Sequence, residues 1–401
     1  MNHGMSFPAP VPLLIPDLPA PEALLPYLQR MHAAQLYSNF GPLVRELEGR
    51  LLDRFTGRTP GALAISSVAN ATLGLELVLT ALDLPPHSRV LLPSLTFVAS
   101  ATAVLRAGHV PVLSDVDPDR WLLTPDIARR ALREVRVDAV MPVAAFGAPH
   151  TMADWSAFEQ ETGIPVVIDA AAAFGSQWLD APRGTAVFSM HATKSLPAGE
   201  GGFVVSTDAA LVARVRQLSN FGINLDPGAG TPVGRLASIG TNAKMSEYHA
   251  AVGLASLDVW DERALVRRQL YAELKAALEQ AGEPGQLRWQ RTEGPVNGPT
   301  LLCVRLPSSG KRARLEQLCE QRRIGMRRWY QPLLGKMLAI HPDSLSLPTP
   351  NAAEIASDMC GLPFFPDMSG EQAATLIDAV GTALARQARR TSLIPADTFK
   401  A

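Results

Sequence analysis

One lysine, Lys194, lies between a short apolar segment and a glycine-rich turn in the stretch FSMHATKSLPAGEGG, residues 188–202. A second apolar segment, residues 203–205, follows this turn. A lysine at the end of a strand, shielded from water, is positioned to form a Schiff base with an aldehyde. Taken alone, Lys194 would be explained better as an ordinary loop lysine.

A second segment favours chemistry at this lysine. The run PVVID, residues 165–169, is typical of a buried strand that ends in a carboxylate, where open α/β sheets hold their ligands. A buried carboxylate without a partner is costly. Lys194 and Asp169 together form the pair that pyridoxal phosphate (PLP) needs, because the carboxylate keeps the pyridinium nitrogen protonated. The alternative for Asp169 is the N-cap of a helix after the strand.

The phosphate of such a cofactor needs its own binding site, and residues 70–77, NATLGLEL, offer one. Asn70 is a good N-cap, and apolar residues recur at helical spacing from Leu75 onward. Free amides near Ala71 and Thr72 favour an anion by about 0.3–1 kcal/mol through the helix dipole. The Thr72 hydroxyl can add a hydrogen bond. A plain capped helix would explain the same pattern.

Three motifs occur in order along the chain: PSLTFVASATAVLRAGHVPVLSDVD, then VIDAAAAFG, then SMHATK followed by GEGG. Together they resemble the DegT/StrS family of PLP-dependent nucleotide-sugar aminotransferases, and the resemblance extends over residues 38–366. It implies a fold-type-I PLP-dependent transferase of the α/β class. Such a protein has a large, mainly parallel-sheet domain and a smaller α+β C-terminal domain.

The resemblance implies roles for further residues. Phe97 would stack on the cofactor ring, and Ser189 would bind the phosphate together with Ala71 and Thr72. His191 lies in the family's SxHxTK context and faces the cofactor or the substrate, and Asn39 lies in a segment similar to the family's TNFGPL entry near the substrate. As isolated residues, Phe97 would be core, Ser189 a satisfied strand hydroxyl, His191 a structural hydrogen-bonding residue and Asn39 part of a helix start.

The segment GTNAKM, residues 240–245, resembles the family motif GxNxRM, whose Asn reaches the phosphate in the neighbouring subunit's site. Asn242 is therefore implied to bind cofactor across a homodimer with a shared active site, with Lys244 replacing the usual Arg. An ordinary turn residue is the alternative. A further departure is Ala172, where the family commonly has a Gln or His that helps to hold the ring hydroxyl. The presence of Lys194 argues against the dehydrating branch of the family, which has His there.

The elements that must position these residues can be read from prolines and apolar periodicity. Residues 1–22 contain six prolines, so we expect them to lie extended. A helix is expected from Pro42, ending at Gly57. Strand-like runs then alternate with helical patterns up to about residue 210; these runs are 90–92, 110–113, 139–143 and 166–168. The alternation predicts a mainly parallel sheet covered by helices.

The predicted domain boundary falls before a long helix. We assign residues 1–255 to the large PLP-binding domain and residues 256–401 to a linker helix and the small C-terminal domain. The linker helix has an apolar stripe from Val266 and ends at Gly282. Beyond it we expect a strand at 300–306, helices at 312–322 and 370–385, and a polar tail from residue 386.

Composition excludes several classes of partner. The 401 residues are 47% hydrophobic and 19% charged, which is ordinary for a soluble α/β enzyme. A net charge of −1 provides no basic field for nucleic acid or anionic lipid. The three cysteines lack metal-ligand spacing and are typical of reduced thiols, so no metal site is expected. The sequence predicts neither a signal peptide nor a membrane span, so we expect a cytoplasmic protein.

The predicted function is that of an aminotransferase. We expect it to convert a nucleotide-linked keto-deoxy sugar, a 4-keto-6-deoxy sugar, to the amino sugar, with glutamate as amino donor. One alternative is PLP-dependent amination of a keto-cyclitol. Another is a non-catalytic regulator that binds PLP or a sugar. The presence of Lys194, Asp169 and Thr72 together favours catalysis, because a regulator has no need of the base.

Overall fold

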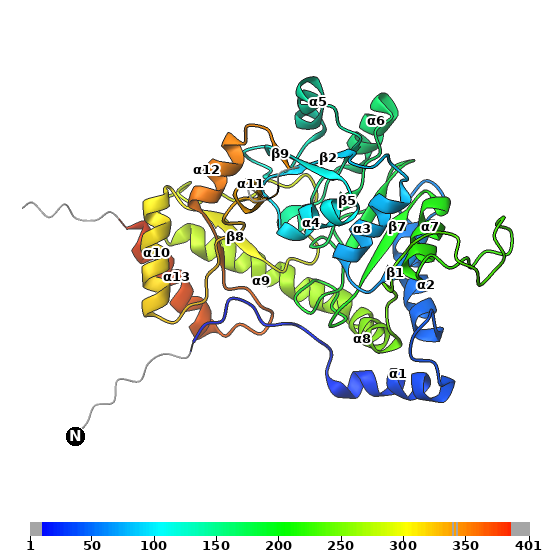
Figure 1. Ribbon diagram of the computed structural model, residues 1–401. Helices are drawn as coiled ribbons and strands as arrows, with labels where there is room; N and C mark the ends of the chain where they lie inside the picture. Colours follow the sequence, from blue (N-terminus) through cyan, green and yellow to red (C-terminus); the bar gives the residue numbers. More distant parts are fainter. Residues whose placement is uncertain (1–9, 339–340, 342–343, 386–401) are drawn as a thin grey trace, which may run out of the picture.

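The computed structural model describes residues 10–338, 341 and 344–385. A central sheet carries most of the strands, and helices pack on its two sides (Figure 1). Its strands are β1 (Ala64–Val68), β2 (Arg89–Pro93), β3 (Val110–Ser114), β4 (Ala139–Val140), β5 (Ile168–Asp169), β6 (Thr185–Ser189), β7 (Gly202–Ser206) and β9 (Leu345–Ser346). One half has the order β1-β7-β6-β5 and the other β4-β2-β3-β9. Parallel bridges from Val140 to Val166 and from Val143 to Asp169 join the two halves.

The mainly parallel sheet predicted from the sequence is confirmed. Strand β2 runs parallel to β3 and β4, and β5 runs parallel to β6. Strand β7 is the exception, because it is antiparallel to both β6 and β1. The run at 139–143 forms only a two-residue strand, since the chain turns into the short helix η1 (Ala145–Gly147) soon after it.

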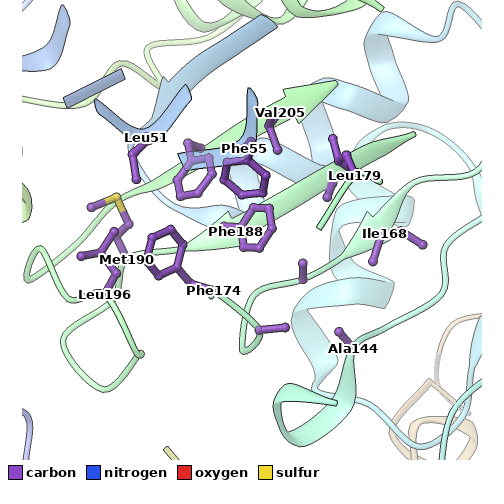
Figure 2. Packing of buried hydrophobic residues seen from close by; sticks show 14 of the residues in the cluster. Leu51, Phe55, Ala144, Ile168, Phe174, Leu179, Phe188, Met190, Leu196 and Val205 are labelled. Carbon is purple, nitrogen blue, oxygen red and sulfur yellow. The ribbon is translucent and has the colours of Figure 1, made fainter. Parts of the chain in front are cut away.

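Alternate residues of the central strands enter two separate cores. Phe188 and Phe203 face one side, with ring centroids 4.8 Å apart, while Val187 and Val204 face the other. This is the two-residue periodicity of a strand that is buried on both faces. Figure 2 shows the first core, in which Phe55 of helix α2 packs with Phe188 and Val205.

Helices of the N-terminal two thirds cover both faces of this sheet. They are α2 (Pro42–Thr56), α3 (Ala71–Ala81), α4 (Val98–Arg106), α5 (Pro125–Glu134), α6 (Met152–Thr162), α7 (Ala209–Ser219) and α8 (Glu247–Asp258). The helix expected from Pro42 is confirmed, and Leu43, Leu47, Leu51 and Phe55 are buried. Helices α2, α5, α6 and α8 contribute to the first core, whereas α3, α4 and α7 contribute to the second.

The N-terminal segment differs in part from the expectation. Residues 10–20 contain no helix, as expected for a proline-rich segment, but helix α1 (Pro21–Ala34) begins at the end of the proline-rich stretch. Proline is tolerated at the first helical position, where its missing N–H has no intrahelical partner. The rest of the expected extended segment, residues 1–9, lies outside the described residues.

The C-terminal third packs around a second, smaller sheet. Its elements are α9 (Trp260–Gln280), β8 (Leu302–Arg305), α10 (Ser309–Gln321), α11 (Leu334–Met337), α12 (Pro350–Asp358), β10 (Met359–Leu362) and α13 (Gly370–Leu384). The expected linker helix, strand and two C-terminal helices are all present. Helix α9 runs from the large sheet to the smaller one, where β8 pairs with β10 (Figure 1). The predicted polar tail lies outside the described residues.

Segments from both sides cross the predicted domain boundary. Val11 pairs with Ile324 and lies in the C-terminal core, although it belongs to the N-terminal segment. Conversely, β9 joins the edge of the large sheet beside β3. The division at residue 255 therefore stays a prediction. No helix among the described residues is long and apolar enough to cross a membrane.

Candidate active site

A cavity of about 690 Å³ opens beside the ends of the central strands. The structure places there seven of the residues predicted from the sequence: Ala71, Thr72, Phe97, Asp169, Ser189, His191 and Lys194. They come from four places in the chain, namely the starts of α3 and α4 and the ends of β5 and β6. The sheet therefore gathers most of the predicted site in one cavity.

Lys194 is held by the loop that connects β6 to β7. The Met190 amide donates to the Gly201 carbonyl over 2.9 Å, and the Lys194 amide donates to the His191 carbonyl over 2.9 Å. Burial lowers the pKa of Lys194, while the charge of Asp169 acts in the opposite direction. A larger fraction of this amine is therefore neutral near neutral pH than for a free lysine, and only the neutral amine can act as nucleophile or base.

The residue after this lysine is fixed by helix α9. Trp260 donates its indole N–H to Ser195 Oγ over 3.1 Å, and Arg267 Nη1 donates to the Ser195 carbonyl over 3.1 Å. Arg267 is itself paired with Asp17 of the N-terminal segment. No motif in the sequence pointed to this support, because its partners are 65 or more residues from Ser195.

Asp169 is 4% exposed at the end of β5. Ser100 donates its hydroxyl to Asp169 Oδ2 over 2.7 Å, and the Ala171 amide donates to Oδ1 over 3.1 Å. Burial raises the pKa of this carboxyl, whereas the two hydrogen bonds and the charge of Lys194 lower it. No helix starts here, so the helix N-cap alternative is wrong. The two hydrogen bonds offset only part of the cost of burying this carboxylate. A cationic partner such as a pyridinium would offset more of it.

The start of α3 fits a phosphate. Asn70 Oδ1 accepts the Leu73 amide over 2.9 Å, which confirms the predicted N-cap. The amides of Ala71 and Thr72, in the first turn, have no intrahelical acceptor and belong to cavity-lining residues. Gly202 allows strand β7 to lie close to the start of α3, because a Cβ at this position would lie 2.9 Å from the Ala71 nitrogen.

Phe97 is 52% exposed at the N-terminus of α4, so the core alternative for this residue is wrong. An exposed ring on a cavity wall is available to stack on a planar ligand. Its ring centroid lies 6.4 Å from that of Tyr330, and Tyr330 in turn stacks on Phe146 at 5.2 Å. Burial raises the pKa of Tyr330, so its hydroxyl stays protonated.

The remaining predicted residues of the cavity, Ser189 and His191, make polar contacts. Ser189 Oγ accepts the His191 amide over 3.2 Å. His191 lies 3.0 Å from Thr193 Oγ1 through Nδ1 and 3.8 Å from Glu200 through Nε2. Ala172 also lines the cavity, and its methyl group offers no hydrogen bond to a ring hydroxyl.

Asn242 and Asn39 do not line the cavity of their own chain. Asn242 is exposed, and its Oδ1 accepts from Lys244 Nζ over 2.7 Å. Asn39 is exposed as well, with a left-handed backbone at φ 60°. The roles assigned to both residues stay predictions.

Sequence reasoning missed one whole side of the cavity. This side, which we call the C-terminal wall, consists of Thr300, Leu301, Arg327, Trp329 and Tyr330. The adjacent aromatic pair Trp329-Tyr330 was the one available signal. Ser100, the donor to Asp169, was missed as well, because a small hydroxyl in an apolar helix is common in cores.

Comparison with known proteins identifies the family. Residues 21–381 match the DegT/DnrJ/EryC1/StrS aminotransferase family. The chain belongs to this family. As a member, it is a PLP-dependent aminotransferase, and the cavity described above has the residue types that bind this cofactor.

Individual family relatives agree in sequence and fold. Protein Rv3402c of Mycobacterium tuberculosis is 31% identical over 292 residues, covering 70% of this chain and 68% of that protein. DesI, solved in the presence of its TDP-sugar product, is 31% identical with a TM-score of 0.80, covering 94% of each chain. DesV of S. venezuelae is 26% identical with a TM-score of 0.79, covering 94% of this chain and 100% of that one. The likeness to DesI and DesV supports a sugar aminotransferase.

Proposed function

We propose that this aminotransferase converts a nucleotide-linked 4-keto-6-deoxy sugar to the corresponding amino sugar, with glutamate as amino donor. The observation that carries the proposal is the meeting of Lys194 and Asp169 with the α3 N-terminus in one cavity. The likeness to DesI, which was solved with a TDP-sugar product, supports the substrate class. Three buried, unpaired cysteines support a reducing compartment, so we place the reaction in the cytoplasm.

Each residue of the site has a distinct task. PLP, when bound, supplies a ring that takes up negative charge from the substrate carbon. Lys194 Nζ would hold the cofactor covalently. Once an amino substrate had displaced it, the Nζ amine would move a proton between the substrate carbon and the cofactor's aldehyde carbon. Asp169 keeps the pyridine nitrogen protonated.

Two further groups fix the cofactor while Lys194 is free. The amides of Ala71 and Thr72 would bind the phosphate, and Ser189 would add a hydroxyl from the end of β6. Phe97 would stack on the ring. Glutamate delivers the amino group in one half of the cycle, and the keto sugar accepts it in the other. The same Lys194 amine serves both halves in opposite directions.

The substrate is tested with enzyme first converted to its pyridoxamine form by glutamate. We expect dTDP-, UDP- or GDP-linked 4-keto-6-deoxy sugar to restore the aldehyde form, which is followed by its absorbance. Simple keto acids other than 2-oxoglutarate should restore it far less. Restoration by a keto-cyclitol, with no response to any nucleotide sugar, would transfer the assignment to keto-cyclitol amination. A binding regulator would not convert with glutamate at all.

A homodimer with shared sites is the second part of the proposal. Asn242 lies outside its own cavity and close in sequence to exposed apolar side chains, including Leu236 and Ile239, which is 89% exposed. Exposed apolar clusters of this kind mark interaction surfaces. If Asn242 serves the neighbouring site, mixing the inactive variant Lys194→Ala with an impaired Asn242→Ala variant should restore activity. One site of the heterodimer then has both residues. Absence of complementation despite demonstrated subunit exchange would contradict the shared site.

A further inference from the structure

Most charged side chains around the active-site cavity have an opposite charge beside them. Arg106 donates through Nε to Glu76 over 2.7 Å, and Lys194 and Asp169 influence each other's charge. Arg327 differs, because it has no carboxylate within ion-pairing distance in the part of the chain that the structure describes. The cavity therefore contains one uncompensated guanidinium, on its C-terminal wall.

Arg327 is held in place without being neutralised. Its guanidinium lies 4.4 Å from the centre of the Trp329 ring, a cation–π contact that orients the group and leaves its charge available. Its backbone is fixed to β10, since the Gly361 amide donates to the Arg327 carbonyl over 2.8 Å. The planar guanidinium of arginine is itself preorganised, so less freedom is lost for each hydrogen bond that it forms to an anion.

Arg327 also lines an open groove of about 580 Å³ between α10 and residues 324–328, outside the cavity. It therefore lies where the cavity meets the outer surface. The groove contains Glu316 and Glu320, which disfavour an anion farther out. Its other arginine, Arg328, is already bound by both oxygens of Glu316 at 2.6 Å. The position at which an anion is best accommodated is Arg327 itself.

We infer that Arg327 binds the diphosphate of the nucleotide-linked substrate, an inference that rests on the proposed function. The carboxylate beside the amino group of a donor is bonded to the reacting carbon, so it must lie deep beside Lys194. The diphosphate is separated from the keto carbon by the sugar ring and lies toward the mouth. A guanidinium binds two phosphate oxygens at once, which matches this group better than a lysine does.

The experiment measures nucleotide binding apart from turnover. Holoenzyme is titrated calorimetrically with dTDP, UDP and GDP, and the tightest of the three is used for the variants. We expect Arg327→Gln to weaken its binding by about tenfold or more, as for loss of a charged hydrogen bond. Arg327→Lys should retain part of the affinity. The neighbouring variant Arg328→Gln is the matched control and should bind like wild type.

Kinetics of the two half-reactions then separate the possible anions. Arg327→Gln should raise the KM for the keto sugar and leave the glutamate half-reaction unchanged. If that variant instead loses the glutamate half-reaction and keeps nucleotide affinity, Arg327 binds the donor carboxylate and the inference is wrong. Unchanged nucleotide affinity in a folded Arg327→Gln protein also overturns it. If wild type binds none of the three nucleotides, the proposed nucleotide-sugar substrate is wrong as well.

Discussion

The two sides of the active-site cavity differ in how they are built. The strand-end side consists of Lys194, Asp169, Thr72 and their neighbours, and rests on a sheet with a hydrophobic core on each face. The C-terminal wall consists of Thr300, Leu301, Arg327, Trp329 and Tyr330, next to the two-stranded β8–β10 sheet. The strand-end side holds the amine of Lys194 and the carboxyl group of Asp169, whereas the wall presents aromatic rings and Arg327.

This difference separates two demands on the protein. A cofactor has fixed chemistry, so its lysine, carboxylate and phosphate site require particular residue types at particular strand ends. A substrate-facing wall must fit a shape, and many combinations of side chains can do so. Variants of the strand-end side should therefore impair both half-reactions, and variants of the wall should impair mainly the sugar half-reaction.

The largest effect is expected for Lys194→Ala. Loss of the covalent link and of the proton carrier should reduce both half-reactions by about 10⁴-fold or more, since a single acid–base group contributes 10²–10⁴. The fold should be kept, which near-wild-type circular dichroism would show. Borohydride followed by peptide mass spectrometry should label Lys194 in wild type and in the control variant Lys275→Ala. Turnover at the wild-type rate in Lys194→Ala would show that the strand-end side does not contain the catalytic base, and the contrast with the C-terminal wall would be wrong.

Asp169→Asn should also slow both half-reactions, on the order of 10²–10⁴-fold. It has a second, opposite consequence for the cofactor-free protein. Because burial raises the pKa of Asp169 above the unfolded value, the folded state binds this proton more tightly. The stability of cofactor-free wild type should then fall as pH rises from the unfolded pKa through the raised one.

The Asn side chain does not ionise, so cofactor-free Asp169→Asn should melt higher than cofactor-free wild type at neutral pH. Thermal unfolding between pH 4 and 8, with and without PLP, measures the pH dependence of wild-type stability and the difference in melting temperature between the two proteins. Equal melting temperatures for the two cofactor-free proteins over this range would show that the desolvated carboxylate carries no penalty.

The smallest effect is expected from Gly361→Ala in the support of the C-terminal wall. A Cβ there would lie 2.3 Å from Trp329 Nε1, so the indole must move, and overpacking of this kind costs about 1–3 kcal/mol. We expect a severalfold higher KM for the keto sugar and an unchanged glutamate half-reaction. Gly370→Ala, where a Cβ would meet nothing within 4 Å, is the control. Equal damage to both half-reactions would erase the distinction between the two sides.

Elements with strong local signals could be predicted from the sequence. Helix α2 could be predicted because Leu43, Leu47 and Leu51 recur four residues apart, and the start of α3 because Asn70 is a good N-cap. Helix α1 was missed because prolines argue against a helix. Pro21 is tolerated because it lies at the first helical position, whereas Pro26 lies inside the helix. Local periodicity cannot show where a proline-containing segment is stabilised by packing.

The same limit applies to the site. Asp169 was identifiable because a carboxylate after an apolar strand is unusual, whereas its donor Ser100 resembles any small helical residue. Arg327 and Trp329 lie far along the chain from Lys194, and tertiary packing, including the pairing of Arg327 with Gly361 of β10, brings them to the cavity. Ion pairing depends on which carboxylates lie nearby, and sequence spacing does not give that.

The contact of Asp17 with Arg267 has a consequence for synthesis on the ribosome. Residues 10–20 emerge early, but Arg267 emerges about 250 residues later, and Phe364, whose amide donates to the Leu13 carbonyl, is made later still. Until Arg267 has left the exit tunnel, the Ser195 carbonyl lacks the donor that fixes the lysine loop. A nascent chain that ends before α9 should therefore present Lys194 on a loosely held loop. Stable cofactor capture is therefore expected only after α9 has emerged from the ribosome.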